Sequence, residues 1–484
     1  MIIKDLEPTI VWKNFYGLTQ IPRPSKHEGK VQEYLLKWGE EHGVEVFRDD
    51  TGNIIFRKGA TPGCENMRGV ILQGHMDMVP QKTSDSSHDF LTDPIKAYVD
   101  GEWVTADRTT LGADNGIGVA MGLAVLEDES IAHGPIEVLV TYDEETGMTG
   151  ANSLKPGVLQ GDILINLDSE EEGELCVGCA GGLDAVADFK YSTSPVQKGY
   201  KGCKFTVSGL QGGHSGMDIS LYRANANKVV ARILLPLIEK AGVGVASFNG
   251  GSLRNAIPFE ASAVIAVPPR KMKKVREIIQ GIFADVKAEY IDSDPGASLA
   301  VEAVDVPAEV IDPEVMLRAV KAILACPAGV VRMSRTMEGL TETSTNMAIV
   351  RTSNGHILVH SLMRSAVDTS KAYLAERMRC LFELAGAKIA IKGGYYGWTP
   401  KLDTPMNKVM MDMFKKVYGR DMKIMATHGG LECAIMGAKY PNWEMVSIGP
   451  TIKYPHSPDE KVNIASVART WEYLKAVLAA VPTK

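Results

Sequence analysis

Short apolar runs that stop abruptly at polar residues set the strongest constraint on the fold of this chain. They are Val70-Ile71-Leu72, Ile136-Glu137-Val138-Leu139-Val140 and Ile163-Leu164-Ile165. Because they are short and rich in β-branched residues, they predict buried strands. Residues 117–126, between the first two runs, carry small and apolar side chains at helical spacing. This order predicts βαβ units, and therefore an α/β fold with a mostly parallel sheet flanked by helices.

The middle of the chain has a different pattern. Period-two segments at 204–208 and 261–267 alternate with helical stretches at 224–238 and 274–289. This predicts an α+β domain with antiparallel sheets, over residues 185–395, inserted into the first domain.

The alternating pattern returns at about Trp398. The chain closes with a predicted amphipathic helix at 465–479, whose Val467, Trp471, Leu474 and Val477 share one face. We therefore expect residues 1–184 and 396–484 to form one discontinuous domain.

Composition limits the functions that such a chain can have. Its 484 residues are 45% hydrophobic and 23% charged, as in ordinary globular proteins, which excludes disorder and small disulfide scaffolds. The net charge is -7 and no basic stripe occurs, so we expect no nucleic-acid partner. No secretory signal or membrane-spanning apolar run is visible, and the cysteines are only seven. We expect a cytoplasmic protein without a membrane partner.

Carboxylates and a histidine follow the predicted strands. In an open α/β sheet, ligands bind outside the carboxyl ends of the strands, so these segments predict one shared site. The segments are Gly74-His75-Met76-Asp77-Met78-Val79, Asp143-Glu144-Glu145-Thr146-Gly147, Asn166-Leu167-Asp168-Ser169-Glu170 and, just before the helix, Leu111-Gly112-Ala113-Asp114-Asn115-Gly116.

The residue types indicate a metal site. Imidazole and carboxylate without thiolate suit zinc, with manganese or cobalt as substitutes. A second histidine, His456, lies in the turn-rich segment 454–460, and two imidazoles with several carboxylates exceed the needs of one tetrahedral ion. Two ions that share a bridging carboxylate would use them all. Each segment alone has a structural explanation as a surface pair, a solvated face or a helix cap, but their joint placement favours a site.

Five motifs resemble those of the co-catalytic di-zinc exopeptidases, the family of carboxypeptidases, aminoacylases and carnosinases. The resemblance covers essentially the whole chain and is closest to the bacterial aminoacyl-histidine dipeptidases, the cytosolic non-specific dipeptidases. The motifs are Gly-His-Met-Asp-Met-Val at 74–79, Leu-Gly-Ala-Asp-Asn-Gly-Ile-Gly at 111–118, Asp-Glu-Glu-Thr-Gly at 143–147, Asn-Leu-Asp-Ser-Glu at 166–170 and Pro-His-Ser-Pro-Asp-Glu at 455–460.

The resemblance implies a set of metal ligands. His75 and Asp168 would bind one Zn²⁺, and Glu145 and His456 would bind a second. Asp114 would bridge the two ions, and its peptide bond to Asn115 would be cis, as in relatives.

The resemblance also implies the catalytic groups. Asp77 would orient the His75 imidazole and raise its basicity. Glu144 would be the general base, taking a proton from the zinc-activated water and passing it to the leaving amine.

The inserted domain would be the lid and dimerisation domain, and the discontinuous domain would be catalytic. Gln211-Gly212-Gly213-His214-Ser215-Gly216 resembles the lid motif of the family, whose histidine approaches the scissile carbonyl from the partner subunit of a homodimer. The alternative for His214 is an incidental place in a Gly-rich hairpin turn. Asn255, in the segment 254–258, also matches the lid pattern and would face the substrate.

Two further residues are candidates for substrate binding. Arg364, in the segment 361–365, would bind the C-terminal carboxylate of the substrate, because arginine binds carboxylates bidentately. A surface arginine on a strand is the alternative. Glu432, in Thr427-His428-Gly429-Gly430-Leu431-Glu432, would hold the free α-amine, unless it only begins a helix.

The function that follows is metal-dependent hydrolysis of unblocked dipeptides, Xaa-His among them. One alternative is an N-acyl-amino-acid deacylase with the same two zinc ions. Another is an inactive, metal-stabilised binding protein. The intact Glu144 and ligand set argue against that second alternative.

Overall fold

The structure is a computed structural model that describes residues 2–484, and the chain divides into two compact units. The first unit contains the chain up to Gly178, Pro400–Ala426 and Leu431–Lys484, and the second contains Cys179–Thr399 and Thr427–Gly430. The sequence pattern predicts divisions after residues 184 and 395, whereas the two compact units divide after residues 178 and 399. It also places the four residues 427–430 in the second unit, which the sequence pattern did not indicate.

The main sheet of the first unit has eight strands in the order β1-β2-β6-β3-β7-β23-β8-β22. The central strands β6, β3, β7 and β23 are parallel, whereas β1, β2 and β8 pair antiparallel toward the edges. The bounds are β1 (Glu45–Arg48), β2 (Ile54–Lys58), β3 (Val70–His75), β6 (Ile136–Thr141), β7 (Ile163–Asn166), β8 (Glu174–Cys179), β22 (Lys423–Thr427) and β23 (Glu444–Ser447). The three apolar runs become β3, β6 and β7, whose residues are all buried, so this prediction is confirmed.

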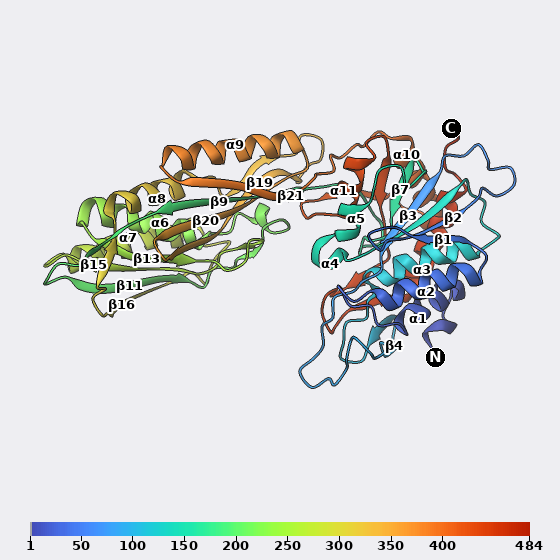
Figure 1. Ribbon diagram of the computed structural model, residues 1–484, viewed down its shortest axis with the longest axis horizontal. Helices are drawn as coiled ribbons and strands as arrows, with labels where there is room; N and C mark the ends of the chain where they lie inside the picture. Colours follow the sequence, from blue (N-terminus) through green and yellow to red (C-terminus); the bar gives the residue numbers. More distant parts are fainter. Residues whose placement is uncertain (1) are drawn as a thin grey trace. The chain divides into compact units, whose positions relative to one another are not determined.

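Helices flank this sheet. In Figure 1, α1, α2 and α3 lie on one side of it and α10 lies on the other. The bounds are η1 (Ile3–Asp5), α1 (Thr9–Thr19), α2 (Gly29–Glu41), α3 (Ala113–Glu127), α4 (Glu144–Gly147), α5 (Thr149–Ser153), α10 (Pro405–Tyr418), α11 (Glu432–Lys439) and α12 (Ile464–Leu478). The α/β fold that the sequence predicts is therefore confirmed, as is its closing helix.

Small residues let α3 lie close to the sheet. A Cβ atom on Gly122 would come within 2.9 Å of the Val138 side chain, and one on Gly118 within 2.4 Å of the Leu167 carbonyl oxygen. Every residue of α3 from Ala113 to Leu126 is buried. Helix α3 therefore packs closely against β6 and against the residue that follows β7.

A smaller sheet of the first unit has the order β24-β25-β5-β4. Its bounds are β4 (Ala97–Asp100), β5 (Trp103–Ala106), β24 (Ile452–Lys453) and β25 (Lys461–Asn463). The turn that carries His456 connects β24 to β25. Because β25 pairs with β5, this sheet brings the turn beside the segment that leads to Asp114.

The second unit is built on a nine-stranded antiparallel sheet, in the order β16-β11-β15-β13-β19-β20-β9-β21 with β18 paired to β19. The bounds are β9 (Gly181–Lys190), β11 (Lys201–Ser208), β13 (Gly244–Gly250), β15 (Ala261–Val267), β16 (Ser298–Val304), β18 (Gly329–Met333), β19 (Thr341–Ser353), β20 (His356–Ser365) and β21 (Lys388–Tyr395). The period-two segments lie in β11 and β15, as predicted.

Helices pack on this sheet and enclose an apolar core with residues such as Phe205, Val230, Ile265 and Phe382. The remaining bounds are β10 (Thr193–Pro195), β12 (Gly213–His214), η2 (Ile219–Leu221), α6 (Ala226–Pro236), η3 (Leu237–Ala241), β14 (Ala256–Ile257), α7 (Met272–Glu289), β17 (Glu309–Ile311), α8 (Pro313–Ala325) and α9 (Asp368–Leu384). The predicted helices at 224–238 and 274–289 are confirmed as α6 and α7.

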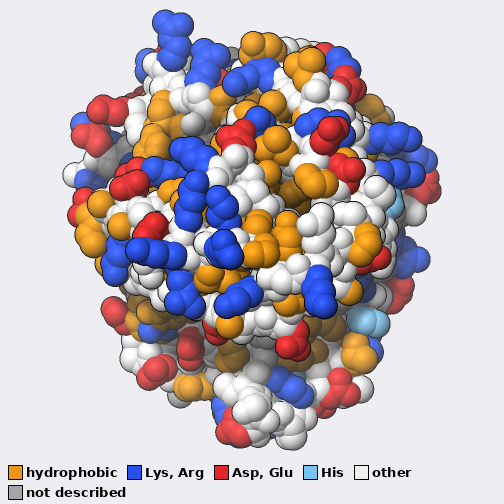
Figure 2. Space-filling model, turned by 90° about the vertical axis from the view of Figure 1, so that its left-hand side faces the viewer, with side chains coloured by type: hydrophobic (Ala, Val, Ile, Leu, Met, Phe, Trp, Pro, Cys, Tyr) orange, Lys and Arg blue, Asp and Glu red, His pale blue; other side chains and the backbone are white. Residues whose placement is uncertain are grey.

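The surface of the second unit is mixed in character. Figure 2 shows Lys and Arg side chains interspersed with acidic, apolar and uncharged ones. Within residues 2–484, no helix combines the length and the apolar character needed to span a membrane.

Candidate metal centre and active site

Five candidate ligands come from separate segments of the first unit. His75 ends β3, Glu145 lies in α4 just after β6, and Asp168 follows β7. Asp114 lies in the first turn of α3, and His456 lies between β24 and β25. Because β3, β6 and β7 are parallel, their carboxyl ends meet at one edge of the sheet, which is where the sequence placed the site.

Asp114 lies between the two imidazoles. Its Oδ1 is 3.1 Å from His75 Nε2, and its Oδ2 is 3.0 Å from His456 Nε2. Asp168 Oδ1 is 3.3 Å from His75 Nε2, whereas Glu145 Oε2 is 3.1 Å from His456 Nε2. The geometry thus divides the five residues into two groups that share one carboxylate.

The electrostatics of this cluster favour cations. Hydrogen bonds to Asp114 and Glu145 raise the pKa of His456 to about 11. Burial acts against the charged form of His75, but Asp168 and Asp114 outweigh it and raise its pKa well above the ordinary value. Burial raises the pKa of Asp168 to about 6, because its charged form is poorly solvated.

The donor set fits divalent metal ions. Two carboxylate oxygens, Glu145 Oε1 and Asp168 Oδ1, are buried and accept no hydrogen bond from the described residues. The contact of Asp168 Oδ1 is the ion pair with His75 Nε2. Buried carboxylate oxygens without donors are unfavourable unless a cation lies near them. Imidazole and carboxylate ligands without thiolate suit zinc, and two groups that share Asp114 suit a pair of ions.

Asn115 connects the Asp114 loop to two strand ends. The Asp114–Asn115 peptide bond is cis, as the resemblance implied. The His75 amide donates to Asn115 Oδ1 at 3.3 Å, and Asn115 Nδ2 donates to the Leu167 carbonyl oxygen at 2.8 Å. A Cβ atom on Gly74 would lie 2.2 Å from Asn115 Oδ1, so this contact requires glycine in β3.

Asp77 contacts both the ligand histidine and the turn that carries Glu144. His75 Nδ1 donates to the backbone oxygen of Asp77 at 3.1 Å, with the Asp77 carboxylate at 3.5 Å. That carboxylate accepts the backbone amides of Glu144 at 3.0 Å and Glu145 at 3.2 Å. Burial would raise the pKa of Asp77, but these bonds and that of His75 hold it at about 2. Asp77 therefore fixes the place of Glu144 and Glu145 as well as that of the imidazole.

Glu144 begins α4, beside the ligands. Burial, together with Asp168 and Glu432, raises its pKa well above the ordinary value, against the effect of His75. A carboxyl group with a raised pKa next to candidate metal ligands is suited to exchange protons.

His214 in the second unit lies on the two-residue strand β12, which pairs with β14. Its Nδ1 accepts the backbone amides of Gly216 at 3.3 Å and Met217 at 3.2 Å. Nδ1 is therefore unprotonated, and Nε2 carries the proton. Burial and the nearby Arg364 lower the pKa of His214, which keeps the ring neutral with one N–H to donate.

Arg364 lies next to His214 rather than on the surface. Its side chain is 5% exposed, and it donates to Ser215 Oγ at 3.3 Å and Tyr395 Oη at 3.1 Å. No carboxylate in the described part of the chain forms an ion pair with it. Asn255 is exposed, and its backbone oxygen accepts the Ser215 amide at 2.8 Å. Ser215 thus connects all three predicted residues of the second unit.

Glu432 lies in the first unit, where it begins α11 and is 2% exposed. Its Oε2 accepts bonds of 2.7 Å from Gln73 Nε2 and from Thr141 Oγ1, on β3 and β6. Its Oε1 has no partner among the described residues, and burial raises its pKa to about 8. Glu432 is thus both a helix start and a buried carboxyl group that bonds to side chains of β3 and β6.

The chain matches a known family of peptidases. The family model described as peptidase family M20/M25/M40 matches residues 71–480. The chain belongs to this family. It is 43% identical to the cytosol non-specific dipeptidase of Escherichia coli over 482 residues, which is 100% of this chain and 99% of the relative.

Solved structures of two peptidases agree with the fold. The aminoacylhistidine dipeptidase of Vibrio alginolyticus superposes with a TM-score of 0.94 at 46% identity, covering 100% of this chain and 98% of that one. The aminopeptidase PepT of Bacillus cereus shares the fold, with a TM-score of 0.58 at 18% identity over 98% of this chain and 99% of that one. The predicted family is therefore confirmed, and with it the combination of an α/β domain and an α+β insert.

The sequence did not indicate a role for three further residues of the two units. Arg23 and Glu460 contact the ligand loops, and His428 Nε2 lies 2.7 Å from Ser344 Oγ in the second unit. Glu460 and His428 lie inside motifs that the sequence did reveal, but Arg23 has no local pattern around it. Its partners are 53 and 89 positions away along the chain.

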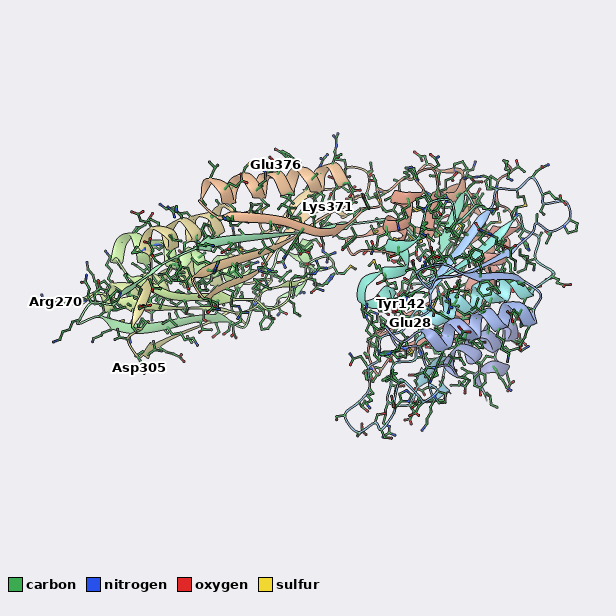
Figure 3. All side chains as sticks on the ribbon, in the orientation of Figure 1. Glu28, Tyr142, Arg270, Asp305, Lys371 and Glu376 are labelled. Atoms are coloured by element: carbon green, nitrogen blue, oxygen red, sulfur yellow. The ribbon has the colours of Figure 1, made fainter. Side chains whose placement is uncertain are left out.

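A second carboxylate cluster joins Asp77 to Asp143 and Glu28, which is labelled in Figure 3. Here the aspartates have donors. Asp143 accepts Lys26 Nζ at 2.6 Å, and Asp77 accepts Ser25 Oγ at 2.8 Å. We therefore interpret this cluster as a hydrogen-bonded support for the turn at Glu144.

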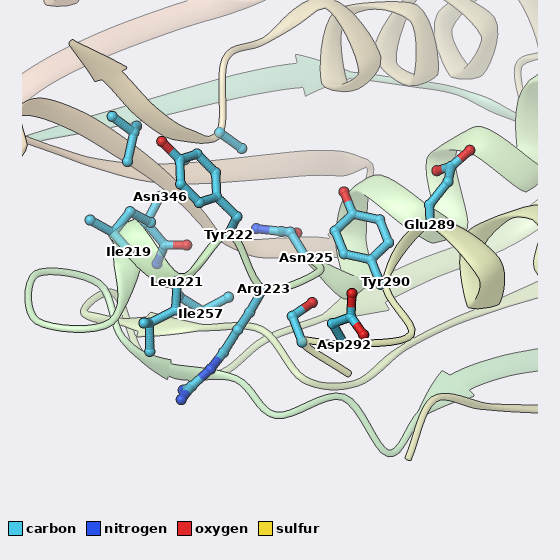
Figure 4. Close-up of a pocket in the computed structure, with 14 residues that line it drawn as sticks. Ile219, Leu221, Tyr222, Arg223, Asn225, Ile257, Glu289, Tyr290, Asp292 and Asn346 are labelled. Atoms are coloured by element: carbon cyan, nitrogen blue, oxygen red, sulfur yellow. The ribbon is translucent and has the colours of Figure 1, made fainter. Parts of the chain in front are cut away.

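A cavity of about 470 Å³ lies in the second unit. Figure 4 shows Tyr222 and Tyr290 on either side of Asn225 in this cavity, with Arg223 pointing away from them. None of the predicted site residues lines it.

Proposed function

We propose that this peptidase hydrolyses unblocked dipeptides, Xaa-His among them, with a metal-activated water and Glu144 as general base. The placement of Asp114 between two imidazoles, one of which also contacts Glu145 next to Glu144, is the observation that carries the proposal. The relatives of similar length support the substrate class, since one is a non-specific dipeptidase and another an aminoacylhistidine dipeptidase.

His75 and Asp168 would hold one Zn²⁺, Glu145 and His456 a second, and Asp114 would bridge them. Mn²⁺ or Co²⁺ could substitute. When bound, two such ions lower the pKa of a water molecule and polarise the peptide carbonyl.

Glu144 moves the proton in this proposal. Its carboxylate accepts a proton from the attacking water and then donates it to the leaving amine. The Asp77 carboxylate accepts hydrogen bonds from the backbone amides of Glu144 and Glu145. With both amides held, Glu144 would face the water and Glu145 would bind metal.

Residues of the second unit would bind the substrate. The neutral His214 would donate Nε2–H to the carbonyl oxygen as negative charge develops there, from the partner subunit of a homodimer. Asn255 would face the substrate beside it. Arg364, without an acidic partner, would bind the C-terminal carboxylate. Glu432, in the first unit, would bind the free α-amine through its unpartnered Oε1.

We also propose a cytoplasmic location. It rests on the low cysteine count and on the cytosolic relative.

Hydrolysis of a small substrate panel tests the function. The panel holds carnosine, several α-dipeptides, a tripeptide and an N-acetyl amino acid, assayed with chelator and after zinc is added back. We expect metal-dependent cleavage confined to the unblocked dipeptides. Preference for the acetylated compound would make the protein a deacylase, and no turnover with zinc bound would make it a binding protein.

A further inference from the structure

Two buried side chains of opposite charge contact the loops that carry the metal ligands. Arg23 lies between α1 and α2, and Glu460 lies four residues after His456. Each is 2% exposed. Neither is a candidate ligand.

Arg23 connects the loop after β3 to the loop before α3. Its Nη1 donates to the backbone oxygens of Met76 at 3.0 Å and Asp77 at 3.1 Å, directly after the ligand His75. Its Nη2 donates to the Gly112 carbonyl oxygen at 2.5 Å, two residues before Asp114. One planar guanidinium thus bonds to two ligand-bearing loops.

Glu460 contacts the same loop through its amides. Its Oε2 accepts the backbone N–H of Leu111 at 2.8 Å and of Gly112 at 2.9 Å, and its Oε1 accepts that of Asp114 at 3.1 Å. Because Glu460 closes the turn that begins near His456, these bonds connect a third ligand segment to the Asp114 loop.

The two charged groups meet at the Gly112 residue. Arg23 binds its carbonyl oxygen and Glu460 binds its N–H. Gly112 has φ +71°, and a Cβ atom there would lie 2.6 Å from Arg23 Nη2. A Cβ atom on Gly116 would lie 2.5 Å from the same nitrogen. A side chain at either position would displace the guanidinium from this place.

We propose that Arg23 and Glu460 are positioning residues that together hold the Leu111–Asp114 loop, so that each oxygen of Asp114 faces a different imidazole. The inference rests on the proposed two-metal site. It assigns these side chains no contact with substrate or metal.

The physical basis is the cost of leaving either group alone. A buried charged group without hydrogen-bond partners is strongly destabilising, and both side chains find these partners on the backbone of the ligand-bearing loops. Glu460 accepts hydrogen bonds from three backbone N–H groups, and one of them is the amide of Asp114. Without the Glu460 carboxylate, the backbone of Asp114, the proposed bridging ligand, loses this hydrogen bond. Residues that orient metal ligands typically contribute about tenfold to 100-fold in metal affinity.

A matched control for Glu460 lies in the main sheet of the first unit, at the end of β6 away from the candidate ligands. Glu137, at the start of β6, is also buried, and its Oε2 accepts the backbone amides of Gln160 at 2.7 Å and Gly161 at 2.9 Å. Its Oε1 accepts Arg57 Nε at 3.1 Å. Glu137→Gln therefore removes a comparable buried carboxylate that holds no metal-ligand loop.

The experiment compares Glu460→Gln, Arg23→Met, the double variant and Glu137→Gln in the full chain. Zinc affinity is measured with a competing chelator, kcat and KM with one dipeptide, and Tm on the metal-free proteins. We expect Glu460→Gln and Arg23→Met each to raise the zinc Kd about tenfold or more and to lower kcat with KM nearly unchanged. The double variant should lose less than the product of the single losses, because both side chains act on Gly112.

The control decides between positioning and general stabilisation. We expect Glu137→Gln to lower the Tm without changing the zinc Kd. If Glu460→Gln lowers the Tm to the same degree and keeps the wild-type zinc Kd, the inference is wrong.

A measurement on the wild-type protein needs no variant to fold. After metal removal, we expect the amides of Leu111, Gly112 and Asp114 to resist hydrogen exchange as strongly as those of β3. Rapid exchange at these amides would show that the loop is not held in advance, which would overturn the inference.

The stoichiometry of the wild-type protein separates the two proposals. Wild-type protein that binds fewer than two zinc ions contradicts the proposed site itself. If the wild-type protein binds two zinc ions and the variants bind zinc as tightly as it does, only the role of Arg23 and Glu460 is contradicted.

Discussion

Histidine has opposite electrostatic surroundings in two clusters. The first cluster is the set of candidate metal ligands in the first unit, and the second consists of His214, Arg364 and His428 in the second unit. In the first unit, hydrogen bonds to Asp114 and Glu145 raise the pKa of His456 to about 11. In the second unit, burial together with Arg364 lowers the pKa of His428 to about 3. The first cluster therefore favours cations, whereas the second holds the buried Arg364 without an acidic partner among the described residues and so favours anions. Hydrolysis of a dipeptide would use both, since metal ions activate the water and a cationic group binds the substrate carboxylate.

The largest effect should come from the carboxyl group beside the cation-favouring cluster. Glu144→Gln keeps the size of the side chain and removes its ability to accept a proton. We expect kcat to fall about 10²- to 10⁴-fold with two zinc ions still bound, as measured by dipeptide hydrolysis and metal analysis. Full activity with zinc bound would show that another group is the base.

His214 tests what the second cluster contributes to the reaction. His214→Ala removes the Nε2–H donor, and we expect kcat to fall about 10²- to 10³-fold, as for loss of one oxyanion donor. Steady-state kinetics on one dipeptide would measure it. A rise in KM with kcat unchanged would instead make His214 a residue for substrate binding alone.

Mixed dimers extend this prediction. If His214 acts across a homodimer, Glu144→Gln subunits mixed with His214→Ala subunits regain one intact site per mixed dimer. Random pairing should then restore about a quarter of wild-type activity. If the mixture stays as inactive as its components, His214 acts within its own subunit.

Arg364 tests the anion preference of the second cluster directly. Arg364→Met removes the guanidinium that has no acidic partner, and we expect kcat/KM for dipeptides to fall about tenfold to 100-fold, as for a lost charge-assisted hydrogen bond. A dipeptide amide, which lacks the carboxylate, should be hydrolysed equally by both proteins. Arg351→Met, on the neighbouring strand β19, removes an exposed arginine and should leave kcat/KM unchanged. An equal loss on the amide would contradict carboxylate binding.

The sequence was informative where chemistry and local structure coincide. His75, Glu145 and Asp168 are next to strands whose apolar runs are visible in the chain, so both the strands and their polar ends could be predicted. Glu432 was harder to interpret, because its partners Gln73 and Thr141 lie in other strands and nothing near Glu432 indicates that it is buried.

The backbone hydrogen bonds of the supporting groups could not be predicted, because they join each side chain to main-chain atoms far away in the chain. Glu460 accepts the Gly112 amide across 348 positions, and any residue could supply that N–H. The resemblance implied the role of Asp77 toward His75, but it did not imply the hydrogen bond that the Asp77 carboxylate accepts from the Glu144 amide, 67 positions away. Bonds to backbone amides leave no pattern of residue types, whereas metal ligands require particular side chains.

The smallest effect concerns stability, and it isolates the low pKa of His428 in the second cluster. In the unfolded chain this imidazole takes up a proton below its ordinary pKa of 6.5, whereas burial and Arg364 keep it neutral in the folded protein down to about pH 3. Its contribution to stability is therefore complete above pH 6.5 and is lost as the pH falls toward 3.

His428→Asn lacks this titration. The unfolding free energy of the wild type relative to that of the variant should fall by about 2 kcal/mol between pH 7 and pH 5, measured by urea unfolding. A constant difference over this range would mean that His428 is protonated as readily in the folded protein as in the unfolded chain, and the contrast between the two clusters would then be lost.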